Sequence, residues 1–258
     1  MIGGITSAHE AFKYEFSRCK NYGDITVSTV SGTVDATNNF FIGGISTGGT
    51  TNVLTLKDLE NHGNIHVTKD AVFPKNLLVG GVVNVAISSS YTYGKLVNTG
   101  NITIEGTVKG ELHCGGVAGR IGASTFVGPL INTGTINVDN MVEFTADKSF
   151  VGGISGVLNA GCKIVDAVSY CDIIANKISN VGWITGSARV EGSILVNNCQ
   201  LGGDKVTIEI DEEDEAVIEK RVPLTAENYF NHIYGGTTDW TGVANYDGCS
   251  FLSAKPIQ

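Results

Sequence analysis

Apolar and polar residues alternate in short runs along most of this chain. In the segment 25–27, for example, isoleucine and valine flank a threonine. Successive side chains of a β-strand point to opposite faces, so such runs predict short strands that each bury one face. Valine, isoleucine, threonine and asparagine are plentiful and proline is rare, which suits many strands joined by turns. The pattern predicts an all-β protein.

A pair of glycines between apolar residues recurs along the chain. The five full copies begin at Ile2, Ile42, Val79, Cys114 and Val151. A degenerate copy at 181–184 has tryptophan in place of the second glycine, and the steps between copies are 40, 37, 35, 37 and 30 residues. Glycine within a strand removes a side chain, so the pair predicts a bulge or a close approach of neighbouring backbone.

A second motif, Asn-x-Gly-x-Ile, recurs in step with the first. Its copies begin at Asn21, Asn61, Asn98 and Asn132, with a weakened copy at Ser169, and the steps are 40, 37, 34 and 37 residues. We expect the glycine to occupy a turn position with positive φ. We expect the asparagines of successive copies to stack as an amide ladder. Two motifs with matching steps define a repeat of 35–40 residues.

The residue two positions before each asparagine is always apolar, which predicts a column that faces the core. In the first copy this residue is Cys19, where the next three copies have leucine. We therefore interpret Cys19 as a small hydrophobic residue rather than a metal ligand or half of a disulfide. The spacing of the six cysteines argues against a disulfide framework.

Each repeat holds about three strand-like runs, and in the fourth these are 112–120, 126–132 and 135–143. Three strands that stack on their equivalents in the next repeat describe a parallel β-helix. We therefore expect a right-handed parallel β-helix (solenoid) of about five to six coils over residues 1–204. The alternative is a β-propeller with one repeat per blade. A blade needs four strands in about 40–45 residues, so the spacing favours the helix.

Residues 205–258 depart from the repeat and predict a C-terminal cap. An alternating strand at 205–210, an acidic turn and a returning strand at 216–224 suggest a hairpin. Thr225 is suited to the N-cap of a short helix over 226–234. Capping segments close the open end of a solenoid.

Charge and hydropathy limit the partners. Only 17% of residues are charged and the net charge is −9, which argues against nucleic acid and against an anionic membrane surface as partners.

No apolar run reaches the roughly 18 residues of a membrane-spanning helix. The first residues form no signal peptide and already carry a repeat motif, so we expect a piece of a longer protein whose targeting segment lies upstream.

Catalytic signatures are missing from the sequence. It contains no His-Glu-x-x-His, Gly-x-Ser-x-Gly or phosphate-binding glycine loop. The nearest approach to a zinc motif, His9-Glu10, lacks the second histidine. His62 and His66 fall on positions expected to face solvent, with no cysteine partner. We therefore predict no metal or cofactor and favour a non-enzymatic role, although a site built across adjacent coils stays an alternative.

Candidate binding residues are those that break the repeat. The tryptophan of the degenerate glycine motif plugs the stack if it points inward, which we favour, or stacks on a sugar if it points outward. The acidic run lacks the spacing of a preformed Ca²⁺ loop, so a solvated hairpin tip is favoured over a cation site. The candidates are Trp183, Asp211, Glu212, Glu213, Asp214, Glu215 and Trp240.

The Val-Gly-Gly-Ile-Ser-Gly pattern at 151–156, together with Asn-x-Gly-x-Ile, resembles the GLUG-type repeats of bacterial surface proteins. Such repeats occur in immunoglobulin A1 protease-like proteins and in large adhesins of Bacteroidetes, and the segment 228–242 looks like the tail of such proteins. The resemblance implies a β-solenoid that is secreted or on the cell surface. The resemblance does not imply protease activity for this chain, because the zinc motif of that family lies in a separate domain.

Together these features predict a non-catalytic, adhesin-like or stalk module that binds a host protein or glycan. The alternative is the solenoid region of an immunoglobulin A1 protease-like protein, or a β-helix carbohydrate-active enzyme.

Overall fold

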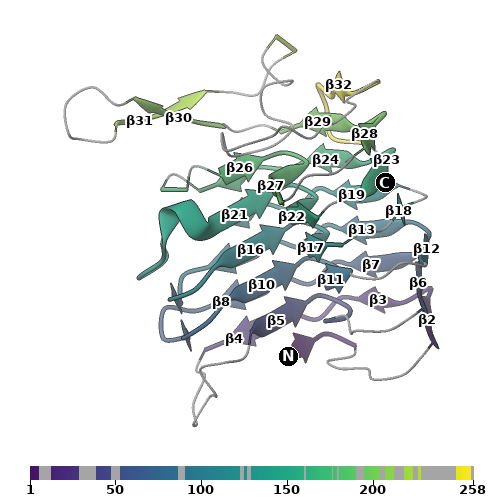
Figure 1. Cartoon of the computed structure of the whole chain (residues 1–258), viewed down its shortest axis with the longest axis horizontal. Coiled ribbons are helices and arrows are strands. Elements are labelled where there is room, and N and C mark those ends of the chain that lie inside the picture. Colours follow the sequence, from purple (N-terminus) through teal and green to yellow (C-terminus); the bar gives the residue numbers. More distant parts are fainter. Residues whose placement is uncertain are drawn as a thin grey trace.

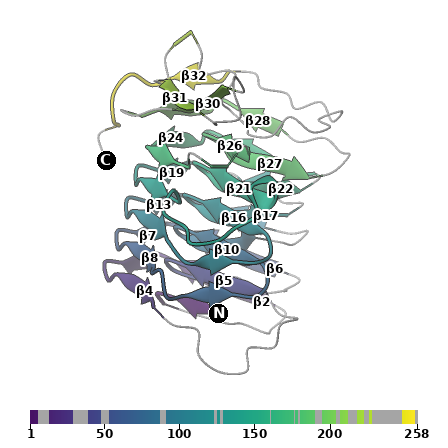
Figure 2. The same ribbon diagram turned by 90° about the vertical axis from the view of Figure 1, so that its left-hand side faces the viewer.

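The chain is a parallel β-solenoid in a computed structural model (Figure 1). The structure describes residues 1–5, 13–28, 39–47, 53–86, 91–122, 125–126, 129–159, 161–175, 177–178, 180–189, 195–203, 207–211, 218–222, 226–227 and 248–256. Strands of successive coils lie one above another from the N-terminal to the C-terminal end in both views (Figures 1 and 2).

The two sequence motifs form the two longest sheets. The Gly-Gly sheet comprises β1 (Ile2–Gly3), β5 (Phe40–Gly43), β10 (Leu77–Gly80), β16 (Leu112–Gly115), β21 (Ser149–Gly152) and β26 (Asn180–Gly182). The Asn sheet comprises β3 (Lys20–Asn21), β7 (Leu59–Asn61), β13 (Leu96–Asn98), β19 (Leu130–Asn132), β24 (Val168–Tyr170), β29 (Gln200–Gly202) and β32 (Ser250–Phe251). We number the levels of the stack one to six by the strands of the Gly-Gly sheet.

A third sheet, the Ile sheet, follows the Asn sheet in every coil where both are formed. It comprises β4 (Ile25–Val27), β8 (Ile65–Val67), β14 (Ile102–Ile104), β20 (Ile136–Asn137) and β25 (Ile173–Ile174). Shorter sheets complete the coils. One has four strands, β11 (Val83–Ala86), β17 (Ala118–Ile121), β22 (Ser155–Asn159) and β27 (Thr185–Arg189). Two have three strands each: the first comprises β2 (Lys13–Ser17), β6 (Val53–Lys57) and β12 (Tyr91–Tyr93), and the second comprises β18 (Thr125–Phe126), β23 (Lys163–Val165) and β28 (Leu195–Asn197). The last pairs β9 (Val72–Phe73) with β15 (Thr107–Val108).

Every pairing between coils is parallel and joins equivalent positions of the repeats. Ile42 pairs with Ile2 on one side and Val79 on the other. Asn98 pairs in the same way with Asn61 and Asn132. Parallel pairing between repeats makes each repeat one coil of a β-helix, and it contradicts the propeller alternative. The all-β parallel β-helix expected from the sequence is confirmed.

The three runs expected in each repeat are interrupted, so the strands are shorter than predicted. The run 112–120 divides into β16 and β17, which are separated by Gly116 and Val117. The run 126–132 divides in the same way into β18 and β19. A coil must turn several corners within 35–40 residues, and a strand cannot continue through a corner. The only helical element in the described residues is a 3₁₀ turn, η1 (Ala146–Lys148).

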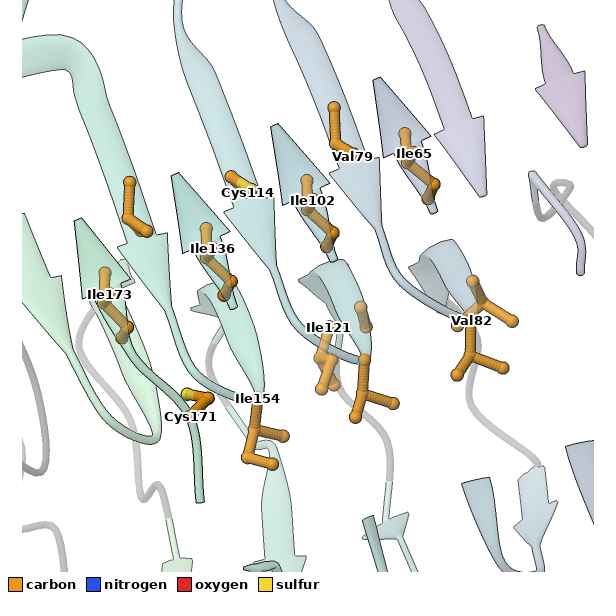
Figure 3. Packing of buried hydrophobic residues seen from close by; sticks show 14 of the residues in the cluster. Ile65, Val79, Val82, Ile102, Cys114, Ile121, Ile136, Ile154, Cys171 and Ile173 are labelled. Carbon is orange, nitrogen blue, oxygen red and sulfur yellow. The ribbon is translucent and has the colours of Figure 1, made fainter. Parts of the chain in front are cut away.

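The core is a set of parallel apolar columns inside the coils. Isoleucines of the Ile sheet lie one behind another and face Val79 and Cys114 of the Gly-Gly sheet (Figure 3). From Ile65 to Ile173 these side chains are almost fully buried, whereas Ile25 at the first level is partly buried. Cys19 occupies the first position of a column that continues through Leu59, and its side chain packs against the core as a small apolar group. Burial raises the pKa of Cys114 to about 12, as expected for a thiol that serves only to pack.

The C-terminal segment holds the expected hairpin but also returns to the stack. Strands β30 (Thr207–Asp211) and β31 (Ile218–Val222) pair antiparallel, as predicted. Strand β32 pairs in parallel with β29, so residues 250–251 form one more level of the Asn sheet. The segment 205–258 is therefore not wholly separate from the solenoid. Ala226 and Glu227 form a turn, and the rest of the expected helix at 226–234 lies outside the described residues.

Candidate functional site

The asparagines of the second motif form a buried amide ladder, as predicted. The side-chain nitrogen of Asn61 donates to Oδ1 of Asn98 at 2.9 Å, and that of Asn98 donates to Oδ1 of Asn132 at 2.9 Å. Asn21 begins the ladder with a 2.8 Å bond to Asn61. The same nitrogens also donate to the carbonyl two residues ahead, as in the 2.8 Å bond from Asn61 to Gly63 O. Each amide thus joins two coils and caps the turn of its own coil.

The glycine of the Asn-x-Gly motif is needed for space, not for the positive φ that was expected from the sequence. The glycines with positive φ in the described residues are Gly161 and Gly248, neither of which belongs to the motif. A Cβ on Gly100 would overlap the carbonyl oxygen of Gly63 one level below. The motif glycine therefore lets equivalent turns stack at the spacing of the sheet.

The two motifs meet across the core. A Cβ on the second glycine of level four, Gly116, would overlap the side-chain amide of Asn132 and the carbonyl oxygen of Gly153. Gly81 is crowded in the same way by Asn98 and by the carbonyl oxygen of Gly116. The Gly-Gly pair thus provides the close approach that was one of its two expected roles. It gives the buried amide ladder the room that it occupies.

Trp183 breaks this arrangement at level six and points inward. Its side chain is fully buried, so the plug interpretation is the one that the structure shows, and no face of the indole is open to a sugar. The indole nitrogen donates 3.1 Å bonds to Cys171 O and Gly202 O. Cys171 holds the position of the glycine in the Asn-x-Gly motif, and Ser169 holds that of the asparagine. The indole therefore caps the carbonyl that an asparagine amide caps in the lower levels.

A second polar ladder runs along the outside of the first levels. Asp24 Oδ1 accepts a 2.7 Å bond from the backbone nitrogen of Asn64, and Asn64 Oδ1 accepts one of 2.9 Å from that of Asn101. Asn101 Oδ1 accepts in turn from the nitrogen of Thr135 at 2.9 Å. These bonds use outward side chains to hold turn backbone, which leaves fewer of the outer polar groups available to a ligand.

The most distinctive surface feature is an aromatic and charged cluster on the first two levels, which we call the Tyr22 platform. Tyr22 and His62 occupy the middle position of consecutive Asn-x-Gly motifs, and their rings stack at 4.8 Å with an interplanar angle of 13°. Tyr22 is 70% exposed. His62 Nε2 lies 3.1 Å from Glu60 Oε2, and its Nδ1 lies 2.8 Å from the hydroxyl of Thr99. Lys20 completes the cluster with a 2.8 Å ion pair to Glu60.

The charges of the platform suit binding better than acid–base catalysis. The hydrogen bond from Lys20 holds the pKa of Glu60 below its usual range, with His62 contributing in the same direction. The same bond raises the pKa of Lys20. A general acid needs a carboxyl whose pKa is raised, so Glu60 is unsuited to that role near neutral pH. The ion pair between Lys20 and Glu60, which the imidazole of His62 helps to hold, instead presents oriented charged groups beside an exposed ring.

Other histidines also pair with glutamates rather than gather around a metal position. His66 Nε2 lies 2.9 Å from Glu105, and His113 Nε2 lies 3.0 Å from Glu111. His113 is buried, whereas His66 is exposed over nearly half of its side chain. Among the described residues, no group of three or more histidine, cysteine or acidic side chains is placed to hold a metal ion.

Of the remaining sequence-based candidates, the structure describes Asp211 alone. Asp211 ends β30, while Glu212, Glu213, Asp214, Glu215 and Trp240 lie outside the described residues. Sequence reasoning missed Tyr22 and His62 as a pair. The signal was present, because equivalent positions of copies 40 residues apart had to lie side by side once the coil was accepted.

No protein-family model, no curated protein and no solved structure matches this chain. Within the described parts of the chain, none of the helical structure is long and apolar enough to cross a bilayer.

Proposed function

We propose that this chain is a non-catalytic repeat module of a secreted or cell-surface protein, adhesin-like or stalk, which binds a host glycan or host protein. The observation that carries the binding role is the Tyr22 platform. Sugar rings stack on exposed aromatic faces while their hydroxyl groups bond to neighbouring polar side chains. Tyr22 offers such a face, and Lys20 and Glu60 offer a donor and an acceptor next to it, with Glu60 held in place by His62.

The stalk role is supported by the buried amide ladder. Backbone hydrogen bonds and the amides of Asn21, Asn61, Asn98 and Asn132 tie each coil to the next. Coils that are joined in this way resist bending and shear, which suits a spacer that holds a binding surface away from a cell. The resemblance to GLUG-type surface repeats supports a secreted or cell-surface location.

The test is a screen of the protein against a glycan array and immobilised mucins, followed by titration calorimetry on each hit. We expect at least one hit, and we expect Tyr22→Ala to weaken it about tenfold or more, since one lost stacking contact is worth about 1.4 kcal/mol. The matched control is Val142→Ala, which removes another exposed apolar side chain at a distant level. No binding at millimolar glycan would overturn the adhesin role and leave a stalk. Binding that Tyr22→Ala leaves unchanged would exclude the platform as its site.

A further inference from the structure

Two cysteines lie side by side where the chain re-enters the stack. Gln200 pairs with Ser250 and Leu201 pairs with Phe251 in parallel register, which places Cys199 next to Cys249 one residue earlier. The backbone nitrogen of Ser250 donates a 2.9 Å bond to Cys199 O, so the neighbouring backbones are held together at this point. The column that begins with Cys19 and continues through three leucines and Ala167 thus ends in two adjacent cysteines.

The backbone turns into the two cysteines in the same way. The residues just before them, Asn198 and Gly248, both have positive φ, at 53° and 74°. Arg18, Asp58 and Asp166 have positive φ at the equivalent corner of other levels. Cys249 therefore enters the Asn sheet through the corner used by the rest of the repeat, although residues 204–247 lie outside the repeat pattern.

The geometry allows a covalent bond between the two sulfurs. Neighbouring strands of a sheet lie about 4.8 Å apart, and the Cα atoms of a disulfide are separated by about 4.4–6.8 Å. The thiols of Cys199 and Cys249 are already hydrogen-bonded to one another, and Cys249 Sγ also lies 3.7 Å from Val196 O. Both cysteines are present as thiols in this structure.

We propose that Cys199 and Cys249 form a disulfide that fastens β32 to β29 and closes the C-terminal end of the solenoid. This assignment reverses, for this pair alone, the expectation that the spacing of the cysteines argues against disulfides. The bond closes a loop that contains the β30–β31 hairpin, so the last level no longer depends on hydrogen bonds alone. Such bonds form and persist in oxidising compartments, which fits the proposed secreted or surface location.

The oxidant is a disulfide, either of low molecular weight or in a thiol–disulfide oxidoreductase. The Cys249 thiolate attacks one sulfur of the oxidant, which forms a mixed disulfide and releases one thiolate. Cys199 then gives up its proton to solvent, and its sulfur displaces the second oxidant sulfur. The protein loses two protons and two electrons, and the oxidant gains them as two thiols. Cys249 acts first because its side chain is only half-buried. The pKa of the Cys199 thiol is raised by its hydrogen bond with Cys249 and by burial, so Cys199 forms a thiolate less readily.

The experiment equilibrates the reduced full chain with an oxidised and reduced glutathione buffer, quenches it with acid, and maps the tryptic peptides without reduction. Cys199 lies in the peptide 190–205 and Cys249 in the peptide 222–258, so a cross-link joins two separate fragments. We expect this cross-linked species to dominate and the number of thiols titrated in denaturant to fall by two. We also expect limited proteolysis within residues 204–248 to leave the two fragments joined until reductant is added.

The controls separate a specific bond from random oxidation. Cys249→Ser must abolish the cross-link and retain all its remaining thiols, and Cys162→Ser must leave the cross-link unchanged. Both cysteines recovered as alkylated monomers after equilibration would overturn the proposal. A mixture of cross-links in which Cys199 pairs equally with Cys162 or Cys171 would overturn it as well. The result does not depend on glycan binding, so this proposal and the Tyr22 platform fail or stand separately.

Discussion

Levels one to four of the stack and levels five to six meet the same requirement with different residues. In the lower levels an asparagine amide caps the carbonyl of its turn, and a glycine across the core makes room for it. Higher up, the hydroxyl of Ser169 lies 3.4 Å from the sulfur of Cys171, and the indole of Trp183 fills the space and caps the Cys171 carbonyl instead. The difference teaches that the repeat conserves a buried hydrogen bond and a packed volume rather than particular residues.

The largest expected effect is the loss of space beside the ladder. Gly116→Ala places a methyl group against the Asn132 amide and the backbone of Gly153, neither of which can move without breaking the stack. We expect a loss of about 4 kcal/mol or more in the free energy of unfolding, measured by urea denaturation. Gly23→Ala is the matched control, because its Cβ would meet only the Asn21 side chain at 3.6 Å. Equal effects of the two substitutions would refute the role given to the Gly-Gly pair.

The substitution of Trp183 tests whether the upper levels can be returned to the lower pattern. Trp183→Gly leaves a cavity and an uncapped Cys171 carbonyl, and we expect it to cost about 3–4 kcal/mol. Ser169→Asn in that background supplies an amide for the same carbonyl and should recover about 1 kcal/mol. In the native background the same change crowds Trp183 and should destabilise the protein. A double-mutant cycle with no coupling would show that the two positions do not share this task.

Removal of one amide from the ladder should cost less than filling its space. Asn98→Ala deprives Asn61 of its acceptor, and Asn132 and Gly100 of their donor. Because these partners are buried, we expect a loss of about 2–3 kcal/mol in the free energy of unfolding. Asn101→Ala removes an exposed side chain of the outer ladder and serves as the control, with an effect within about 1 kcal/mol. If Asn101→Ala were the more harmful change, the inner ladder would not be the stabilising one.

The smallest effect is expected at the surface of the first levels. The pKa of Glu60 is lowered in the folded state, so its contribution is present above the ordinary carboxyl pKa and is lost as pH falls through the folded value. The urea midpoint of the native protein should therefore fall more steeply on acidification than that of Glu60→Gln, and high salt should reduce the difference. Glu143→Gln, at an exposed site, is the control. A parallel pH dependence of the native protein and Glu60→Gln would contradict the assignment.

Much of the fold followed from periodicity, but the reasons for individual residues did not. The steps of the two motifs predicted the coil, the amide ladder and the leucine column with Cys19 at its start. The same reasoning gave the wrong physical reason for the glycine of the Asn-x-Gly motif. A glycine that adopts positive φ in a turn and a glycine that makes room for neighbouring backbone look alike in a sequence. The strands were predicted too long because the alternation of apolar and polar residues continues through the corners of the coil, such as the one at Gly116.

What the sequence by itself determined is the repeat, because equivalent residues 35–40 positions apart can bury their apolar faces only by stacking. What only the tertiary structure decided are the contacts across the core and those between neighbouring levels whose residues are not equivalent in the repeat or are separated by an insertion. These include Gly116 against Asn132, the indole of Trp183 on the carbonyl of Cys171, and Cys249 beside Cys199. Each joins residues from different positions of the repeat, or across an insertion, and the register that brings them together is set by the whole stack rather than by local spacing.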